Sequence, residues 1–238
     1  MARDDLFTRT APGAGEFRFD EAVARVLPDM LRRSIPGYHT LLELLGVLAR
    51  DVVPAGGRVY DLGCSHGAVS AVIRGALGER TVRCVGVDSS PAMIDEARKN
   101  LAGFGDIELH CADVRDFEPE PASLVVLNFT LQFVPPDERS QLLARWGAAL
   151  DPGGILVLSE KVAEVDGRFA QLHDAFREAN GYSQLEMSRK RRALENVLIP
   201  DTVEEHEARL RGAGLEPRQW FRALHFVSFL AQKPPSQP

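Results

Sequence analysis

The amino-acid sequence predicts an α/β fold with a mostly parallel sheet and helices on both of its faces. Two observations support this prediction. Strand-like and helix-like segments alternate through residues 58–161, and acidic or polar residues end several of the strand-like segments. Alternation of this kind implies parallel strands that are joined by helices. The chain has 238 residues, which is enough for one such domain with a full hydrophobic core.

The segment 1–53 is predicted to form a helical lid made of short helices interrupted by prolines. Asp20 can cap a helix that begins at Glu21, and Pro28 and Pro36 each suit the first turn of a new helix. After Pro36 the apolar residues follow helical spacing. These apolar residues are Leu41, Leu44, Leu45, Leu48 and Val52.

The segment 54–161 is predicted to form the parallel part of the sheet. Strand-like runs occur at 58–63, 81–88, 107–114, 124–128 and 155–161. Helix-like runs occur between them at 68–77, 91–102 and 136–150. Pro152, Gly153 and Gly154 predict a turn that leads into the last of these strands. The order of the runs predicts a repeated strand–helix unit.

Beyond Lys161 the pattern changes. The segment 162–200 predicts two polar helices that Asn180 and Gly181 separate. The segment 201–232 predicts one more helix, which Gly214 can end, and then two strand-like runs at 217–224 and 225–232. We expect the two runs to pair as an antiparallel hairpin at the edge of the sheet.

The composition favours an enzyme that acts on a small molecule. Lys and Arg number 28 and Asp and Glu number 34, so the net charge is −6, whereas dedicated nucleic-acid binders are usually basic. The three cysteines are odd in number and form no CxxC pair, which argues against a disulfide framework or a metal site. No apolar run resembles a signal peptide or a membrane span. We therefore expect a cytoplasmic protein without a membrane or nucleic-acid partner.

Four polar loops follow the predicted strands and form an ordered series. The first contains Gly63 and Gly67, with a GxxxG spacing that differs from dinucleotide and P-loop motifs. Asp88 can accept the hydroxyls of a ribose, and Asp113 can accept an adenine amino group. Asn128 ends the fourth strand, close to where the reacting end of a nucleoside cofactor would lie. The series predicts binding of S-adenosylmethionine.

The sequence closely resembles the bacterial carboxy-S-adenosylmethionine synthases, which have the class I methyltransferase fold. The resemblance covers nearly the whole chain, and several of its motifs lie outside the generic cofactor loops. These motifs are FDE at 19–21, PDM at 28–30, RSIPGY at 33–38, YDLGCS at 60–65, VVLNFTLQF at 125–133, LSEK at 158–161, ANGYS at 179–183 and LENV at 194–197.

The resemblance implies a reaction, a substrate and an assembly. The family converts S-adenosylmethionine and prephenate into carboxy-S-adenosylmethionine and phenylpyruvate, through a sulfonium ylide that captures carbon dioxide. The product then supplies a carboxymethyl group for tRNA wobble uridine modification by another enzyme. The resemblance also implies a homodimer, in which the helices of 162–200 contribute to the interface and the active site. A small-molecule methyltransferase and a catalytically silent binding protein are the alternatives.

Site residues follow from the same resemblance. The implied cofactor-binding residues are Tyr38, Gly63, Cys64, Ser65, Asp88, Ser89, Asp113, Val114, Asn128 and Arg191. The family usually has Asn where this chain has Ser89. Tyr38 and Arg191 are the implied catalytic residues, and Arg191 would reach the new carboxylate from the neighbouring subunit. Because Arg192 is adjacent, the match to the family could be shifted by one residue, and Arg192 could have this role instead. An arginine there suits a carboxylate, because a guanidinium would be repelled by the bare sulfonium cation.

Overall fold

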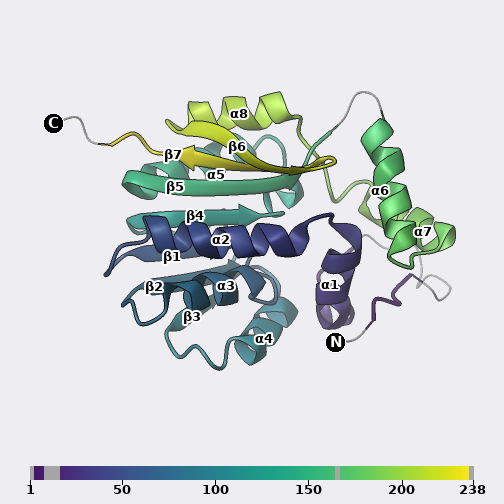
Figure 1. Ribbon diagram of the computed structural model, residues 1–238, viewed down its shortest axis with the longest axis horizontal. Helices are drawn as coiled ribbons and strands as arrows, with labels where there is room; N and C mark the ends of the chain where they lie inside the picture. Colours follow the sequence, from purple (N-terminus) through teal and green to yellow (C-terminus); the bar gives the residue numbers. More distant parts are fainter. Residues whose placement is uncertain (1–2, 8–16, 164–166, 236–238) are drawn as a thin grey trace.

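The structure is a computed structural model that describes residues 3–7, 17–163 and 167–235. Its centre is a sheet of seven strands in the order β3-β2-β1-β4-β5-β7-β6 (Figure 1). The strands are β1 Arg58–Leu62, β2 Arg83–Asp88, β3 Ile107–Cys111, β4 Ala122–Asn128, β5 Leu150–Lys161, β6 Glu216–Ala223 and β7 Phe226–Gln232. β1 to β5 pair in parallel, and β7 is antiparallel to both of its neighbours. The predicted fold class and the terminal hairpin are therefore confirmed.

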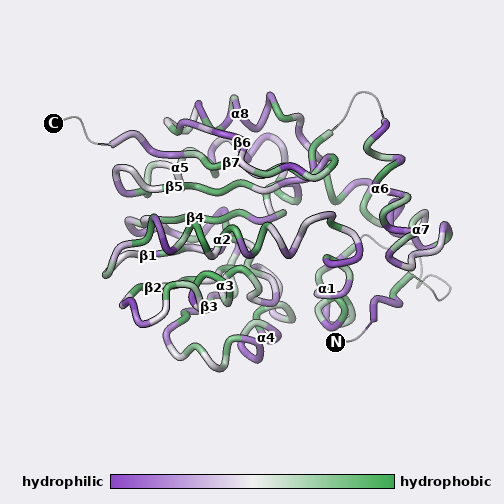
Figure 2. The backbone as a smooth tube through the Cα atoms, viewed as in Figure 1, coloured by the Kyte–Doolittle hydropathy of each residue, from purple (hydrophilic) through white to green (hydrophobic). Residues whose placement is uncertain are grey.

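Helices pack on both faces of this sheet. They are α1 Glu21–Ser34, α2 Tyr38–Val52, α3 Ala68–Leu77, α4 Pro91–Asn100, α5 Arg139–Ala149, α6 Arg168–Ala179, α7 Gln184–Leu194 and α8 Val203–Gly212, with a short 3-10 helix η1 at Leu131–Phe133. Alternate residues of β4 point to opposite faces, as the two-residue period of a strand requires. Leu124 and Val126 pack in one hydrophobic cluster with α2 and α3, whereas Val125 and Leu127 pack in the other with α5. The central strands are correspondingly apolar (Figure 2).

The prediction that Pro28 starts a new helix is wrong. α1 runs without interruption from Glu21 to Ser34, with Pro28 inside it. Asp20 caps this helix as predicted, because its Oδ1 accepts the backbone N–H of Val23 at 3.0 Å. An interior proline costs about 3 kcal/mol in a helix. Burial of the apolar face of α1, which includes Leu27 and Met30, offsets that cost.

The predicted turn at Pro152, Gly153 and Gly154 is an irregularity inside β5. The pairing of β5 with β4 passes from Leu150 directly to Ile155, so the intervening residues bulge out of the ladder. Gly153 donates its N–H to the carbonyl of Lys233 at 3.0 Å, and Lys233 donates to Gly154 at 2.9 Å. Backbone hydrogen bonds from the C-terminal segment therefore replace those of a free turn.

The helices after β5 agree with the sequence prediction. Ser183 with Glu186 begins α7 and Thr202 with Glu205 begins α8, each pair forming a capping box. α1, α6 and α7 gather at one end of the sheet, beyond the carboxyl ends of the parallel strands (Figure 1). No helix in the described part of the chain is long and apolar enough to span a membrane.

Candidate active site

A cavity of about 450 Å³ lies at the carboxyl ends of the strands, and residues of α1, α6 and α7 form part of its lining. Ligands of open α/β sheets bind at this edge. All ten site residues predicted from the sequence line this cavity, although they come from six separate segments of the chain. They are Tyr38, Gly63, Cys64, Ser65, Asp88, Ser89, Asp113, Val114, Asn128 and Arg191.

The glycine loop after β1 turns sharply against the end of β4. Gly63 has φ +72°, and a Cβ built on it would lie 2.4 Å from Oγ1 of Thr130. Ser65 also adopts a positive φ, of 52°, which costs of order 1–3 kcal/mol for a non-glycine residue. Its backbone N–H donates to Oδ2 of Asp88 at 2.9 Å. The loop is therefore held against the second strand in a conformation that exposes its backbone to the cavity.

Asp88 ends β2, and each of its two carboxylate oxygens accepts one backbone hydrogen bond. Besides the bond from Ser65, its Oδ1 accepts the backbone N–H of Ser90 at 2.9 Å. Burial is the main influence on this carboxyl and raises its pKa above the ordinary value. A carboxylate has about four acceptor positions, so two remain for further donors. This geometry suits the two hydroxyls of a ribose.

Two buried oxygens near the glycine loop lack a hydrogen-bond partner among the described residues. One is Oδ1 of Asp61, whose Oδ2 accepts both the N–H and the hydroxyl of Ser70 at 3.0 and 2.6 Å. The other is Oδ1 of Asn128, at the end of β4. Burial raises the pKa of Asp61 to about 6. Unpaired buried acceptors are costly. Of these two residues Asn128 lines the cavity, so a polar ligand that donates to its oxygen fits this site.

Both carboxylate oxygens of Asp113 already accept hydrogen bonds from an arginine side chain. Arg115 donates from Nη2 to Oδ2 of Asp113 at 2.7 Å and from Nε to Oδ1 at 3.0 Å. Arg115 also reaches Glu138 at 2.8 Å, and its hydrogen bonds lower the pKa of Asp113. An adenine amino group would share Asp113 with this arginine. The sequence prediction did not include Arg115, which lies only two residues further along the chain.

The loop after β4 rests on a buried carboxyl group. Glu160 is fully buried and accepts the backbone N–H groups of Thr130, Leu131 and Gln132 at 3.1, 2.7 and 3.1 Å. Burial raises its pKa to about 8. Phe129, in the same loop, has a positive φ of 62°. These contacts fix the position of Asn128 relative to the cavity.

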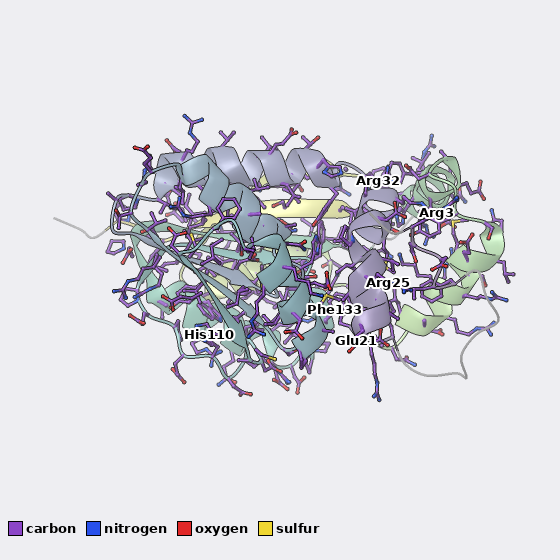
Figure 3. All side chains as sticks on the ribbon, turned by 90° about the horizontal axis from the view of Figure 1, so that it is seen from below. Arg3, Glu21, Arg25, Arg32, His110 and Phe133 are labelled. Atoms are coloured by element: carbon purple, nitrogen blue, oxygen red, sulfur yellow. The ribbon has the colours of Figure 1, made fainter. Side chains whose placement is uncertain are left out.

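Aromatic side chains close the cavity on the side of α1 and α2. Tyr38 is buried at the start of α2, its ring 6.4 Å from that of Phe129, and burial raises the pKa of its hydroxyl. Phe133, labelled beside α1 in Figure 3, packs edge-on against Phe19 with 5.1 Å between ring centroids. Phe17 packs edge-on against Phe19 in turn. The wall excludes water from one side of the site.

The two arginines that the sequence left open lie differently in the structure. Arg191 lines the cavity of its own chain, whereas Arg192 is exposed and does not line it. The Nη2 of Arg191 pairs with Oδ2 of Asp174 at 2.9 Å, and its side chain is 67% exposed in the single chain. Arg191 is therefore the arginine available to a ligand in the cavity.

Further cationic residues line the same end of the cavity and were missed by the sequence prediction. They are Lys161 from β5, Arg177 from α6 and Lys190 from α7. The run of basic residues that contains Lys190 looks like a solvated charged face in the sequence. The signal that could have found Lys190 is the helical spacing of α7, since Lys190 lies one turn after the buried Met187.

Comparisons with known proteins show the family of the chain. Residues 59–154 match the family model described as a methyltransferase domain. The carboxy-S-adenosyl-L-methionine synthases of Shewanella amazonensis and Pasteurella multocida are 46% and 43% identical to this chain. The alignments cover 97% and 98% of this chain and 98% and 100% of those proteins. The chain belongs to the carboxy-S-adenosyl-L-methionine synthase family.

Solved structures share the fold at much lower identity. An O-methyltransferase family protein from Burkholderia thailandensis has a TM-score of 0.68 at 17% identity, over 91% of this chain and 60% of that protein. Mitomycin 7-O-methyltransferase has a TM-score of 0.62 at 18% identity, over 90% of this chain and 57% of that protein. These likenesses concern the class I methyltransferase fold. Membership of the synthase family rests on the full-length relatives.

Proposed function

We propose that this enzyme converts S-adenosylmethionine and prephenate into carboxy-S-adenosylmethionine and phenylpyruvate. The observation that carries the proposal is that Arg191 lines the same cavity as Asn128 and the glycine loop. A cation at the reacting end of a sulfonium cofactor disfavours that cofactor alone, whereas it favours a product with a carboxylate on the sulfonium carbon. A plain methyltransferase has no use for this arrangement.

The residues of the cavity have separable tasks in this reaction. Asp88 and Asp113 would hold the ribose and the adenine, while the unpaired oxygen of Asn128 would accept a donor of the methionine end. In the overall reaction the methyl carbon loses a proton and gains the carbon dioxide released from prephenate, whose hydroxyl leaves as water. Arg191 would hold the new carboxylate. The aromatic wall would keep bulk water from the reacting carbon.

The mass of the small molecule that co-purifies with the enzyme tests this function. A ligand heavier than S-adenosylmethionine by one carbon dioxide supports the synthase. Incubation of purified enzyme with S-adenosylmethionine and prephenate should then yield that ligand and phenylpyruvate together. S-adenosylhomocysteine as the bound ligand, with no consumption of prephenate, would favour the alternative of a small-molecule methyltransferase.

We also propose that the enzyme is a homodimer in which α6 and α7 lie at the interface, so that an Arg191 side chain, from the same or the neighbouring subunit, reaches the ligand in each cavity. The exposed position of Arg191, together with the exposed apolar side chains of Leu172 on α6 and Leu185 on α7, supports this assembly, because a second copy could cover them. Light scattering at micromolar concentration should give twice the chain mass. A monomer that is fully active would contradict both parts of this proposal.

A further inference from the structure

Lys190 is a buried cation without a carboxylate partner. Its side chain belongs to α7, is 8% exposed as a residue and lines the cavity. The ammonium donates to Oγ of Ser34 at 2.9 Å and lies 5.3 Å from the centre of the Tyr182 ring. In the described part of the chain, no carboxylate oxygen lies within 4.0 Å of it. A buried charge is costly unless an ion of opposite sign joins it.

The groups that face Lys190 do not neutralise it. Asp4 is the nearest acidic influence, but the hydroxyls of Ser34 and Tyr182 stand between its carboxylate and the ammonium. The guanidinium groups of Arg33 and Arg177 act on it as like charges. Burial is the largest influence and lowers the pKa of Lys190 to about 8. At neutral pH the ammonium is therefore charged and available to an anion.

Arg177 extends this cationic end from the side of α6. Its Nη2 contacts Asp174, while its Nε is buried without a hydrogen-bond partner in the described part of the chain. The neighbouring His173 adds no charge. Its Nε2 lies 2.6 Å from the carbonyl of Ser34 and must carry the proton, while its Nδ1 accepts from Nε2 of His225 at 3.0 Å. Burial lowers the pKa of both histidines.

We propose that Lys190, with Arg177 beside it, forms a subsite for one carboxylate of a dianionic dicarboxylic acid. This inference rests on the proposed function, in which that acid is prephenate, and it assigns the substrate's own carboxylate to a place separate from Arg191. Lys190 supplies a desolvated ammonium, and Arg177 supplies the unpaired Nε. A bound carboxylate would give the Lys190 ammonium an anionic partner and the Arg177 Nε a hydrogen-bond acceptor. These charge-assisted hydrogen bonds favour binding.

The subsite is tested by comparing Lys190→Met with Arg192→Met. The two substitutions remove the same charge from α7, but Arg192 is exposed and does not line the cavity. Prephenate and S-adenosylmethionine are each titrated by calorimetry, and initial rates give KM for prephenate. Lys190→Met should weaken the binding of prephenate roughly ten- to a hundredfold, which is the loss expected for a buried charge-assisted hydrogen bond. It should leave the affinity for S-adenosylmethionine within twofold, and Arg192→Met should change neither.

Two outcomes of these titrations overturn the subsite. An unchanged affinity for prephenate removes Lys190 from it. An equal loss for S-adenosylmethionine assigns Lys190 to the cofactor's amino-acid carboxylate instead. If Lys190→Met does not fold, the wild-type enzyme provides the test: isophthalate should compete with prephenate far better than benzoate, and equal competition refutes a second carboxylate subsite. If the wild-type enzyme makes no carboxylated product, the proposed function fails, while the titration of prephenate still decides the subsite.

Discussion

Replacing Gly63 by alanine should destabilise the protein through two separable effects. The first is the backbone, because φ +72° costs an alanine about 1–2 kcal/mol. The second is steric, because the new Cβ would lie 2.4 Å from Oγ1 and 2.5 Å from Cγ2 of Thr130. Thr130 must move, and its hydroxyl would lose the 2.8 Å hydrogen bond to the carbonyl of Leu62, at about 1 kcal/mol.

Two other glycines in the chain separate these effects. Gly56 has φ +78° with nothing within 4 Å of an added Cβ, so Gly56→Ala should show the backbone cost alone. Gly103 also has open space and needs no positive φ, so Gly103→Ala should be close to neutral. Gly63→Ala should cost about 2–3 kcal/mol, which lowers Tm by roughly 4–12 °C in a chain of this size.

Denaturant unfolding and calorimetry with S-adenosylmethionine are the assays. Removing the Thr130 methyl and hydroxyl groups should relieve the contact, so the double variant Gly63→Ala with Thr130→Ala should be less destabilised than the sum of the single variants, by at least 0.5 kcal/mol. Gly63→Ala should also weaken binding of S-adenosylmethionine, since the loop lines the cavity. Additive double-variant energies, or a Gly63→Ala protein as stable as Gly103→Ala, would refute the reasoning.

Further predictions concern the cofactor and the cationic end. Asp88→Ala should weaken S-adenosylmethionine by roughly ten- to a hundredfold by calorimetry, and unchanged binding would remove Asp88 from the site. Arg191→Ala should reduce the preference for the carboxylated over the ordinary cofactor by roughly tenfold in competition titrations, whereas an equal loss for both ligands would make it structural. Because burial lowers the pKa of Lys190 to about 8, its charge is lost as pH rises through that value. The kcat/KM for prephenate should therefore fall above about pH 8 in the wild type, and a profile that Lys190→Arg does not shift upward contradicts the assignment.

The sequence predicted most of the fold because its pattern is local. Strands and helices alternate along residues 58–161, and each element has its own period and its own end signals. The two errors arose where distant residues decide the local structure. Pro28 stays inside α1 because the helix is buried against its neighbours, and the Gly153 region joins β5 because Lys233 supplies its hydrogen bonds. Neither partner is visible within a sequence window.

In the candidate site, too, the residues with a local signal were predicted and those that depend on distant packing were missed. Asp88, Asp113 and Asn128 were predicted because they end or closely follow strands that meet at one edge of the sheet. Lys190 was not predicted, because the basic run around it resembles a solvated face. Its inward position follows from the helical spacing after the buried Met187 and from the contact of α7 with Ser34 of α1. The assignment of S-adenosylmethionine itself agrees with the family of the chain.

Ser34 joins three helices through one residue. Its carbonyl meets His173 of α6 and its hydroxyl meets Lys190 of α7, while Ser34 ends α1, four residues before Tyr38. A ligand that draws the Lys190 ammonium away from Ser34 changes what holds the end of α1, which lines the cofactor's part of the cavity. If the proposed subsite holds, the two substrates are thermodynamically linked, so that each alters the affinity of the other by the same factor. The sign of that linkage then sets whether each substrate binds more tightly or less tightly once the other is bound.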